Sequence, residues 1–154
     1  MVVVDHRTVP EIVMRPGIRG QFLANHELGA RGVSLLANAV DPGAAVPLHK
    51  HTVEETMLVL EGTVWIQVSD ERQTVGPQCT VIIPADTPHA WGNSGPGVAR
   101  LLWAFAGSDP FGDATYLEGQ PPAVPTRSAS SGPRPSRRGK RKSTRRARAP
   151  RSRR

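Results

Sequence analysis

Apolar and polar positions alternate along much of the first 106 residues, in short runs separated by turn residues. In the run 63–68, Val64, Ile66 and Val68 fall on one face and the residues between them fall on the other. A period of two is typical of a β-strand with one buried face. The same pattern predicts strands over 32–40, 56–60, 63–68, 73–75, 80–83, 89–91 and 98–105.

Turn signals separate these strands. Asp41-Pro42-Gly43 follows the first strand, Glu61-Gly62 follows the second, and 69–72 is a polar hairpin tip. We find no convincing amphipathic helix longer than a turn or two. Short strands at close spacing with Gly and Pro breaks predict an all-β sandwich or barrel.

Two histidines and a carboxylate lie close together in the stretch 43–55. His49, His51 and Glu55 all occupy odd positions, so on a single strand they would share one face. A transition metal needs such a convergence of nitrogen and oxygen ligands. His89 follows in the stretch 84–93 and is a fourth candidate if that stretch folds beside the first. Glu54 is an alternative to Glu55, but it would face the opposite side unless a bulge intervenes.

These residues resemble the conserved motifs of the cupin family. Gly43, His49, His51, Glu55 and Gly62 have the spacing of the first cupin motif, position for position. The stretch 84–93 is similar to the second motif, through Pro84, Asp86, His89 and Asn93. Asp86 stands where glycine is the commonest residue of the motif, and Gly76, in place of its opening glycine, stands slightly farther upstream than usual. The resemblance covers roughly 32–106 and selects Glu55 over Glu54.

The resemblance implies a fold and a metal site. The fold is a double-stranded β-helix of the jelly-roll type, a cupin barrel. The implied ligands of one divalent transition metal are His49, His51, Glu55 and His89. A ligand set of imidazole and carboxylate without thiolate suits Fe, Mn, Ni, Co, Zn or Cu, and the ligand set does not choose among them.

Three functions are consistent with such a site. The leading hypothesis is an oxidoreductase of the dioxygenase type that acts on a small enol, diketone or phenolic substrate. A second is a non-redox isomerase, lyase or cyclase that uses the metal as a Lewis acid and needs a general acid or base, which the sequence does not identify. A third is a non-catalytic cupin that binds a metal or small ligand, with a polyanion-binding tail.

The pocket around the metal is predicted to be apolar. Met57 and Val59 continue the parity of Glu55, Trp91 shares the strand face of His89, and Trp103 and Phe105 are candidates for the far edge. The motifs contain no anchor for an acidic substrate, and Arg100 is the only nearby candidate.

Charge divides the chain into two parts. Residues 1–126 hold seven basic and all thirteen acidic residues, a net charge of −6, whereas 127–154 hold thirteen basic residues and no acidic one. This tail lacks aromatic, Leu, Ile, Val and Met residues, so we expect it to be disordered. We therefore predict a single domain over 1–119, a Pro-rich linker over 120–126 and a tail over 127–154 that could make non-specific contacts with nucleic acid or other polyanions.

The remaining expectations concern location and assembly. No apolar run is long enough to span a membrane, where about 18 residues are needed. Cys79 is the only cysteine, which excludes an internal disulfide and fits the cytoplasm. Because its neighbours are apolar, we predict that Cys79 is a small core residue. The cupin resemblance implies a homodimer.

Overall fold

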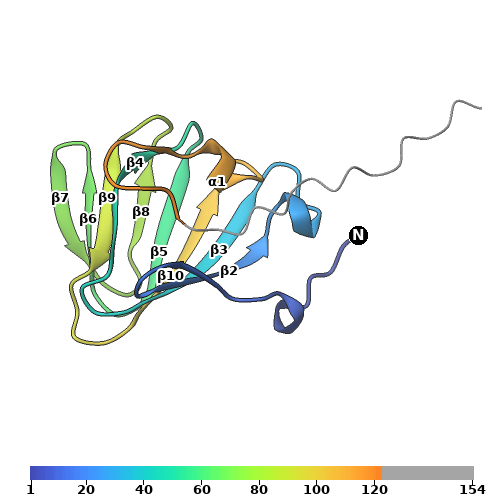
Figure 1. The fold of residues 1–154 in the computed structure, drawn as a ribbon, viewed down its shortest axis with the longest axis horizontal. Coiled ribbons are helices and arrows are strands. Elements are labelled where there is room, and N and C mark those ends of the chain that lie inside the picture. The colour runs from blue at the N-terminus through green and yellow to red at the C-terminus, as the bar shows by residue number, and fades with distance from the viewer. Residues whose placement is uncertain (123–154) are drawn as a thin grey trace, which may run out of the picture.

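Two antiparallel β-sheets face each other in the computed structural model, which describes residues 1–122 (Figure 1). The larger sheet has the order β1-β2-β3-β10-β5-β8 and the smaller has the order β11-β4-β9-β6-β7. The strands of the larger sheet are β1 (Ile12–Arg15), β2 (Ile18–Ala24), β3 (Ser34–Val40), β10 (Ala99–Phe105), β5 (Glu55–Glu61) and β8 (Thr80–Ile83). Those of the smaller are β11 (Thr115–Tyr116), β4 (Ala45–Lys50), β9 (His89–Asn93), β6 (Val64–Val68) and β7 (Glu71–Val75).

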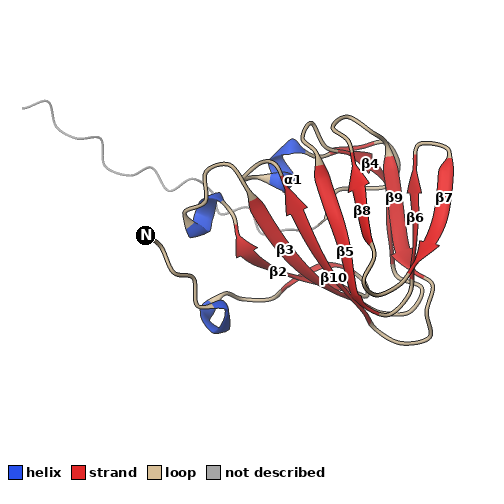
Figure 2. Cartoon of the chain, turned by 180° about the vertical axis from the view of Figure 1, so that it is seen from behind, coloured by secondary structure: helices blue, strands red, loops and turns tan. Residues whose placement is uncertain are grey.

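Helix is confined to three short segments in the described chain (Figure 2). They are the 3-10 turns η1 (His6–Thr8) and η2 (His26–Leu28) and the single-turn helix α1 (Pro110–Asp113). None of the helices in residues 1–122 has the length and hydropathy that a membrane crossing would require. The all-β prediction is confirmed, and the two-sheet arrangement is that of a jelly roll.

The core lies between the two sheets and follows from the alternation along the strands. In β10, Ala99, Leu101, Trp103 and Phe105 are buried while Arg100 is exposed. β6 contributes Val64 and Ile66 to the same core from the opposite sheet. Each strand therefore places every second side chain in the space that the sheets enclose.

The stretch 43–55 does not form one strand, which corrects the parity argument made from the sequence. β4 ends at Lys50 in the smaller sheet, and β5 begins at Glu55 in the larger sheet. Residues 51–54 carry the chain from one sheet to the other. His49 and Glu55 consequently face each other across the barrel and do not share a strand face.

The strands predicted between 32 and 105 are all present, with boundaries shifted by a few residues. The hairpin tip is Ser69 and Asp70, between β6 and β7. The prediction for Cys79 was wrong, because its side chain is exposed and it precedes the short edge strand β8. Most of the predicted linker and the whole of the tail, residues 123–154, lie outside the described residues.

Candidate metal centre and adjoining cavity

Strand register brings two of the predicted ligands side by side in the smaller sheet. His49 on β4 pairs with His89 on β9, and its other neighbour in the sheet is Tyr116 on β11. Directly opposed residues of antiparallel strands project from the same face. The three rings therefore form a row on the inner face, with centroids 4.2 Å apart for His49 and His89 and 5.1 Å apart for His49 and Tyr116.

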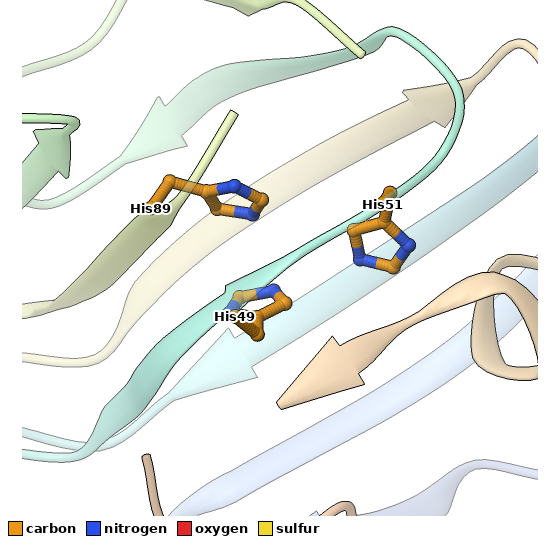
Figure 3. A group of neighbouring side chains, drawn as sticks. All are labelled: His49, His51 and His89. Carbon is orange, nitrogen blue, oxygen red and sulfur yellow. The ribbon is translucent and has the colours of Figure 1, made fainter. Parts of the chain in front are cut away.

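His51 reaches the same place from the connection between the sheets. Figure 3 shows its ring beside those of His49 and His89, with His49 on β4 and His51 just beyond the end of that strand. One ring nitrogen from each of the three histidines lies within 4.8 Å of the other two, and all three side chains are buried. Nitrogen ligands around one ion with bonds of about 2.1 Å are roughly 3–4 Å apart, so small ring rotations would close this cluster around an ion.

Glu55 approaches the histidines from the larger sheet. It pairs with Phe105 and Ile83 on the inner face, and its side chain is 2% exposed. Its Oε1 atom lies 3.0 Å from Nε2 of His89, but it is not part of the tight three-histidine group. Glu54, by contrast, is exposed, and its backbone oxygen accepts a hydrogen bond from the backbone N–H of Ala106. Its side chain is therefore not placed as a ligand of the cluster.

Backbone carbonyls fix two of the imidazole rings. Nδ1 of His49 lies 2.8 Å from the carbonyl oxygen of Pro47, and Nδ1 of His89 lies 2.9 Å from that of Thr87. A carbonyl oxygen can only accept, so both Nδ1 atoms must donate a proton. At neutral charge each ring therefore keeps an unprotonated Nε2, the form that binds metal.

His51 has a different neighbour. Its Nδ1 atom lies 3.7 Å from Oδ2 of Asp113 on α1, too far for a hydrogen bond. The other carboxylate oxygen of Asp113 accepts hydrogen bonds from the backbone N–H and the hydroxyl of Thr52. Thr52, the residue after His51 in the chain, thus holds Asp113 beside His51.

A cavity of about 40 Å³ adjoins the cluster and opens toward solvent. Its walls include the three predicted aromatic residues Trp91, Trp103 and Phe105, whereas Met57 and Val59 are buried in the core and do not line it. The cavity is lined by Met14, Arg15, Ile18, Val46, His49, His51, Glu55, Trp91, Trp103, Phe105, Phe111 and Tyr116. Arg15, Phe111 and Tyr116 are only partly buried, so they form the mouth.

Comparison with known proteins places this geometry in a family. The family model described as a cupin domain matches residues 39–105, which include His49, His51, Glu55 and His89. This protein carries a cupin domain. No curated protein sequence matches the chain significantly.

Solved structures support the cupin fold. Oxalate decarboxylase from Bacillus subtilis, at pH 4.6, is 19% identical with a TM-score of 0.66, and the match covers 74% of this chain and 31% of that one. A structure of the same enzyme from a study of its Mn(II) centres is 20% identical with a TM-score of 0.61, covering 69% and 29%. This chain thus spans about a third of the length of those proteins, and at such identity the likeness shows the fold alone.

A third similar structure is closer in size to this cupin. The polyketide cyclase RemF from Streptomyces resistomycificus is 28% identical with a TM-score of 0.58. The match covers 68% of this chain and 78% of that one.

Burial keeps His49 and His51 of the cupin site neutral. It lowers the pKa of His49 from 6.5 to about 3, and the nearby His89 lowers it further, while the hydrogen bond to Pro47 acts in the opposite direction. Burial also lowers the pKa of His51, against the opposing effect of Glu55. Both rings are therefore neutral at pH 7 and can present lone pairs.

The donor atoms of this cupin fit a bound cation. Nε2 of His89 carries a lone pair and faces a carboxylate oxygen of Glu55, and although the two atoms are 3.0 Å apart their geometry is not that of a hydrogen bond. Nδ1 of His51 and Oδ2 of Asp113 are also buried without a hydrogen-bond partner. Buried acceptors that face each other are costly unless a proton or a cation lies between them.

Sequence reasoning missed the residues outside 39–105 that approach the cluster and the cavity. Arg15 comes from β1, Phe111 and Asp113 from α1, and Tyr116 from β11. Arg100, the anchor considered from the sequence, is exposed and pairs with Glu61 at 3.3 Å, away from the cavity. No motif or periodic pattern in the sequence singled out Arg15.

Proposed function

We propose that this cupin is a metal-dependent enzyme that acts on a small enol, diketone or phenolic molecule. The observation that carries the proposal is the buried three-histidine cluster, with an opposing carboxylate, at the inner end of a solvent-accessible cavity. A buried cluster without a cavity would favour a structural metal. Here the cavity gives a ligand direct access to His49, His51 and Glu55.

The proposed ligands of one divalent transition metal are His49, His51, His89 and Glu55. Such an ion, when bound, supplies either a Lewis acid or a redox centre. The mixed nitrogen and oxygen set suits Fe, Mn, Ni, Co, Zn or Cu, and the Mn(II) centres named for the Bacillus subtilis decarboxylase make manganese a first candidate to test.

The cavity argues for a small reacting group. A volume of about 40 Å³ accommodates only the oxygen-bearing end of a substrate, because typical pockets for drug-sized ligands have about 300–1,000 Å³. Trp91, Trp103 and Phe105 provide apolar walls around that end. The remainder of a larger substrate would lie at the mouth beside Phe111 and Tyr116.

Non-redox chemistry of the cyclase or isomerase type is the reaction class that we favour. It requires a proton donor in the cavity, and Tyr116 supplies a phenol there. Burial raises the pKa of Tyr116, although Arg15 opposes the shift, so the phenol is protonated at neutral pH and can donate to a substrate oxygen. The similarity in size and sequence to a polyketide cyclase supports this choice.

Dioxygenase-type oxidation is the second candidate. It is favoured by the three-histidine, one-carboxylate donor set, which would leave two positions of a six-coordinate ion for oxygen ligands. The two classes differ in whether oxygen is consumed.

One experiment tests both candidates. Separate samples of the full chain are loaded with Zn(II), Mn(II) or Fe(II) and incubated with a panel of 1,3-diketones and phenols, while an oxygen electrode and mass spectrometry follow the reaction. Turnover without oxygen uptake, retained with zinc, supports the non-redox class. Oxygen uptake matched to product, only with iron or manganese, supports the dioxygenase.

The matched control is His51→Ala, which should lose stoichiometric metal and all turnover while keeping the β-rich circular dichroism spectrum. Turnover in that variant equal to the parent would refute the metal site. Metal binding without turnover of any compound in the panel would contradict the enzyme proposal and favour a binding cupin.

Three further expectations belong to this proposal. We place the protein in the cytoplasm as a homodimer, and we assign the basic segment 127–154 to non-specific contact with nucleic acid or another polyanion. Light scattering tests the dimer, and salt-dependent DNA retention tests the role of the basic segment.

A further inference from the structure

A single cationic side chain lies at the mouth of the cavity. Arg15 ends β1 at the edge of the larger sheet, and it is partly buried among the lining residues. The other basic residues of the described chain are absent from the cavity lining.

The guanidinium of Arg15 is held in place by neutral groups. One nitrogen donates to the carbonyl oxygen of Gln120 at 2.5 Å, and the group lies over the ring of Tyr116, 5.0 Å from its centroid. A stacked guanidinium keeps its plane fixed and leaves most of its five N–H donors available at the edges. Arg15 is therefore oriented by its contacts, but its charge is not neutralised by them.

Three of the other arginines within residues 1–122 have carboxylate partners, whereas Arg31 and Arg72 have none, and Arg72 lies over the ring of Trp65. Arg7 pairs with Asp5, Arg19 with Glu11 and Asp41, and Arg100 with Glu61. Within residues 1–122, Arg15 forms no such ion pair, although residues 1–126 carry a net charge of −6. An unpaired guanidinium at the mouth of a cavity that holds His49, His51 and Glu55 at its inner end is positioned to receive an anion.

The charge of the loaded site points in the same direction. Three neutral imidazoles contribute nothing, and the carboxylates of Glu55 and Asp113 offset a divalent ion. Arg15 then leaves one positive charge in excess. A ligand with one negative charge would restore neutrality, whereas a neutral ligand would leave the guanidinium without a partner.

We propose that Arg15 binds a carboxylate or enolate oxygen of the ligand and so makes the cavity selective for anionic chelators. The chelating oxygens face the histidine cluster, and the anionic group lies at the mouth, where the guanidinium donates charge-assisted hydrogen bonds to it. This inference rests on the proposed metal site for the position of the chelating oxygens. It adds the charge of the substrate, which the proposed function leaves open.

Arg15 could instead act only as a structural link to the segment that follows β11, through Gln120. The two roles differ in what a substitution changes. A structural link affects neutral and anionic ligands alike and lowers the stability of the fold. An anion anchor affects only the preference between them.

The test uses 3,4-dihydroxybenzoate and 3,4-dihydroxybenzamide, which share the chelating catechol oxygens but differ in one negative charge on the opposite side of the ring. Isothermal titration calorimetry measures Kd for both on the zinc-loaded full chain. The parent protein should bind the benzoate at least about tenfold more tightly, because hydrogen bonds between charged groups contribute a factor of this order. Arg15→Gln should remove that preference, with the Kd for the benzamide, the zinc content and Tm unchanged, and Arg15→Lys should restore part of it.

Arg100→Gln is the matched control, since Arg100 is an exposed arginine outside the cavity, and it should keep the preference. Three outcomes would each overturn the assignment of Arg15 while leaving the metal proposal intact. The first is an unchanged preference in Arg15→Gln, and the second is equal weakening of both ligands together with a lower Tm. The third is binding of neither compound to zinc-loaded parent protein. Failure of the parent chain to bind zinc would overturn the metal site. In that case the charge preference measured on the metal-free chain, present or absent, still decides the role of Arg15.

Discussion

Two of the three histidines are oriented by the residues immediately before them in the chain. His49 and His89 each donate from Nδ1 to the carbonyl oxygen two positions earlier, at Pro47 and Thr87. Their ring orientation is thus set within the strands that carry them. His51 lies outside the strands, and Oδ2 of Asp113, a residue far away in sequence, lies 3.7 Å from its Nδ1 atom.

Asp113 should therefore tune metal affinity through His51. In Asp113→Asn the side chain keeps its shape and its link to Thr52, but the negative charge beside Nδ1 is removed. Loss of such a partner typically weakens metal binding by about 10- to 100-fold. Competition with a chromophoric chelator measures the change. Asp70→Asn, in the exposed hairpin between β6 and β7, should bind metal as the parent does, and equal affinity in both variants would contradict the role of Asp113.

The neutral histidines make the metal-free protein sensitive to acid. The pKa of His49 is lowered from 6.5 to about 3, so between these values the unfolded chain binds a proton that the folded chain excludes. The neutral His49 ring therefore makes its full contribution to the free energy of unfolding above pH 6.5, and this contribution is lost as the pH falls toward 3.

Urea unfolding of metal-free protein at several pH values between 7 and 4 tests this dependence. The free energy of unfolding should fall with pH, and the difference between the parent and His49→Gln should narrow, because glutamine does not titrate. A constant difference across this range would show that His49 is protonated equally in both states.

At the level of whole elements, the sequence predicted the centre of the barrel better than its edges. The strands from 32 to 105 were predictable because alternation and turn residues agree there. β1 has four residues and a register irregularity, and β2 contains Gly20 and Arg19, so neither shows a clear period. β11 has two residues and exists only through its pairing with β4.

The same distinction explains what was predicted of the site. Motif spacing identified His49, His51 and His89, although the single-strand argument for their convergence was wrong at the turn after Lys50. Arg15 and Tyr116 could not be found, because long-range strand pairing brings them to the cavity and no local pattern encodes it.

Two glycines of the first motif offer a matched test of how the turns constrain the barrel. Gly43 and Gly62 both have positive φ, at 77° and 87°. A Cβ at Gly43 would meet nothing within 4 Å, whereas one at Gly62 would lie 2.8 Å from the Cα of Ala99. Gly43→Ala should cost about 1 kcal/mol from backbone strain alone. Gly62→Ala should cost roughly 2–4 kcal/mol, since steric overlap with β10 adds to the strain. Urea unfolding compares the two, and equal costs would show that β5, β6 and β10 adjust freely around this turn.

At the scale of the whole molecule, charge is separated between an acidic N-terminal part and a basic C-terminal segment. Residues 1–126 carry −6 and 127–154 carry +13. The residues that line the cavity lie between Met14 and Tyr116, and so do the three histidines of the cluster. Metal binding and polyanion binding should therefore be separable.

Removal of 127–154 should abolish retention on DNA while leaving metal stoichiometry and the urea midpoint unchanged. Binding by the full chain should weaken steeply with salt, because each neutralised phosphate contributes about −0.9 to the slope of log K against log salt concentration. The control replaces the thirteen basic residues with glutamine, so that length is kept and only charge is lost. Nitrocellulose filter binding at several salt concentrations measures the slope. If the glutamine variant still binds DNA, residues 1–126 must contain a binding surface of their own. If it loses metal, the basic segment must support the cupin site. Either result would contradict the separation of the two activities.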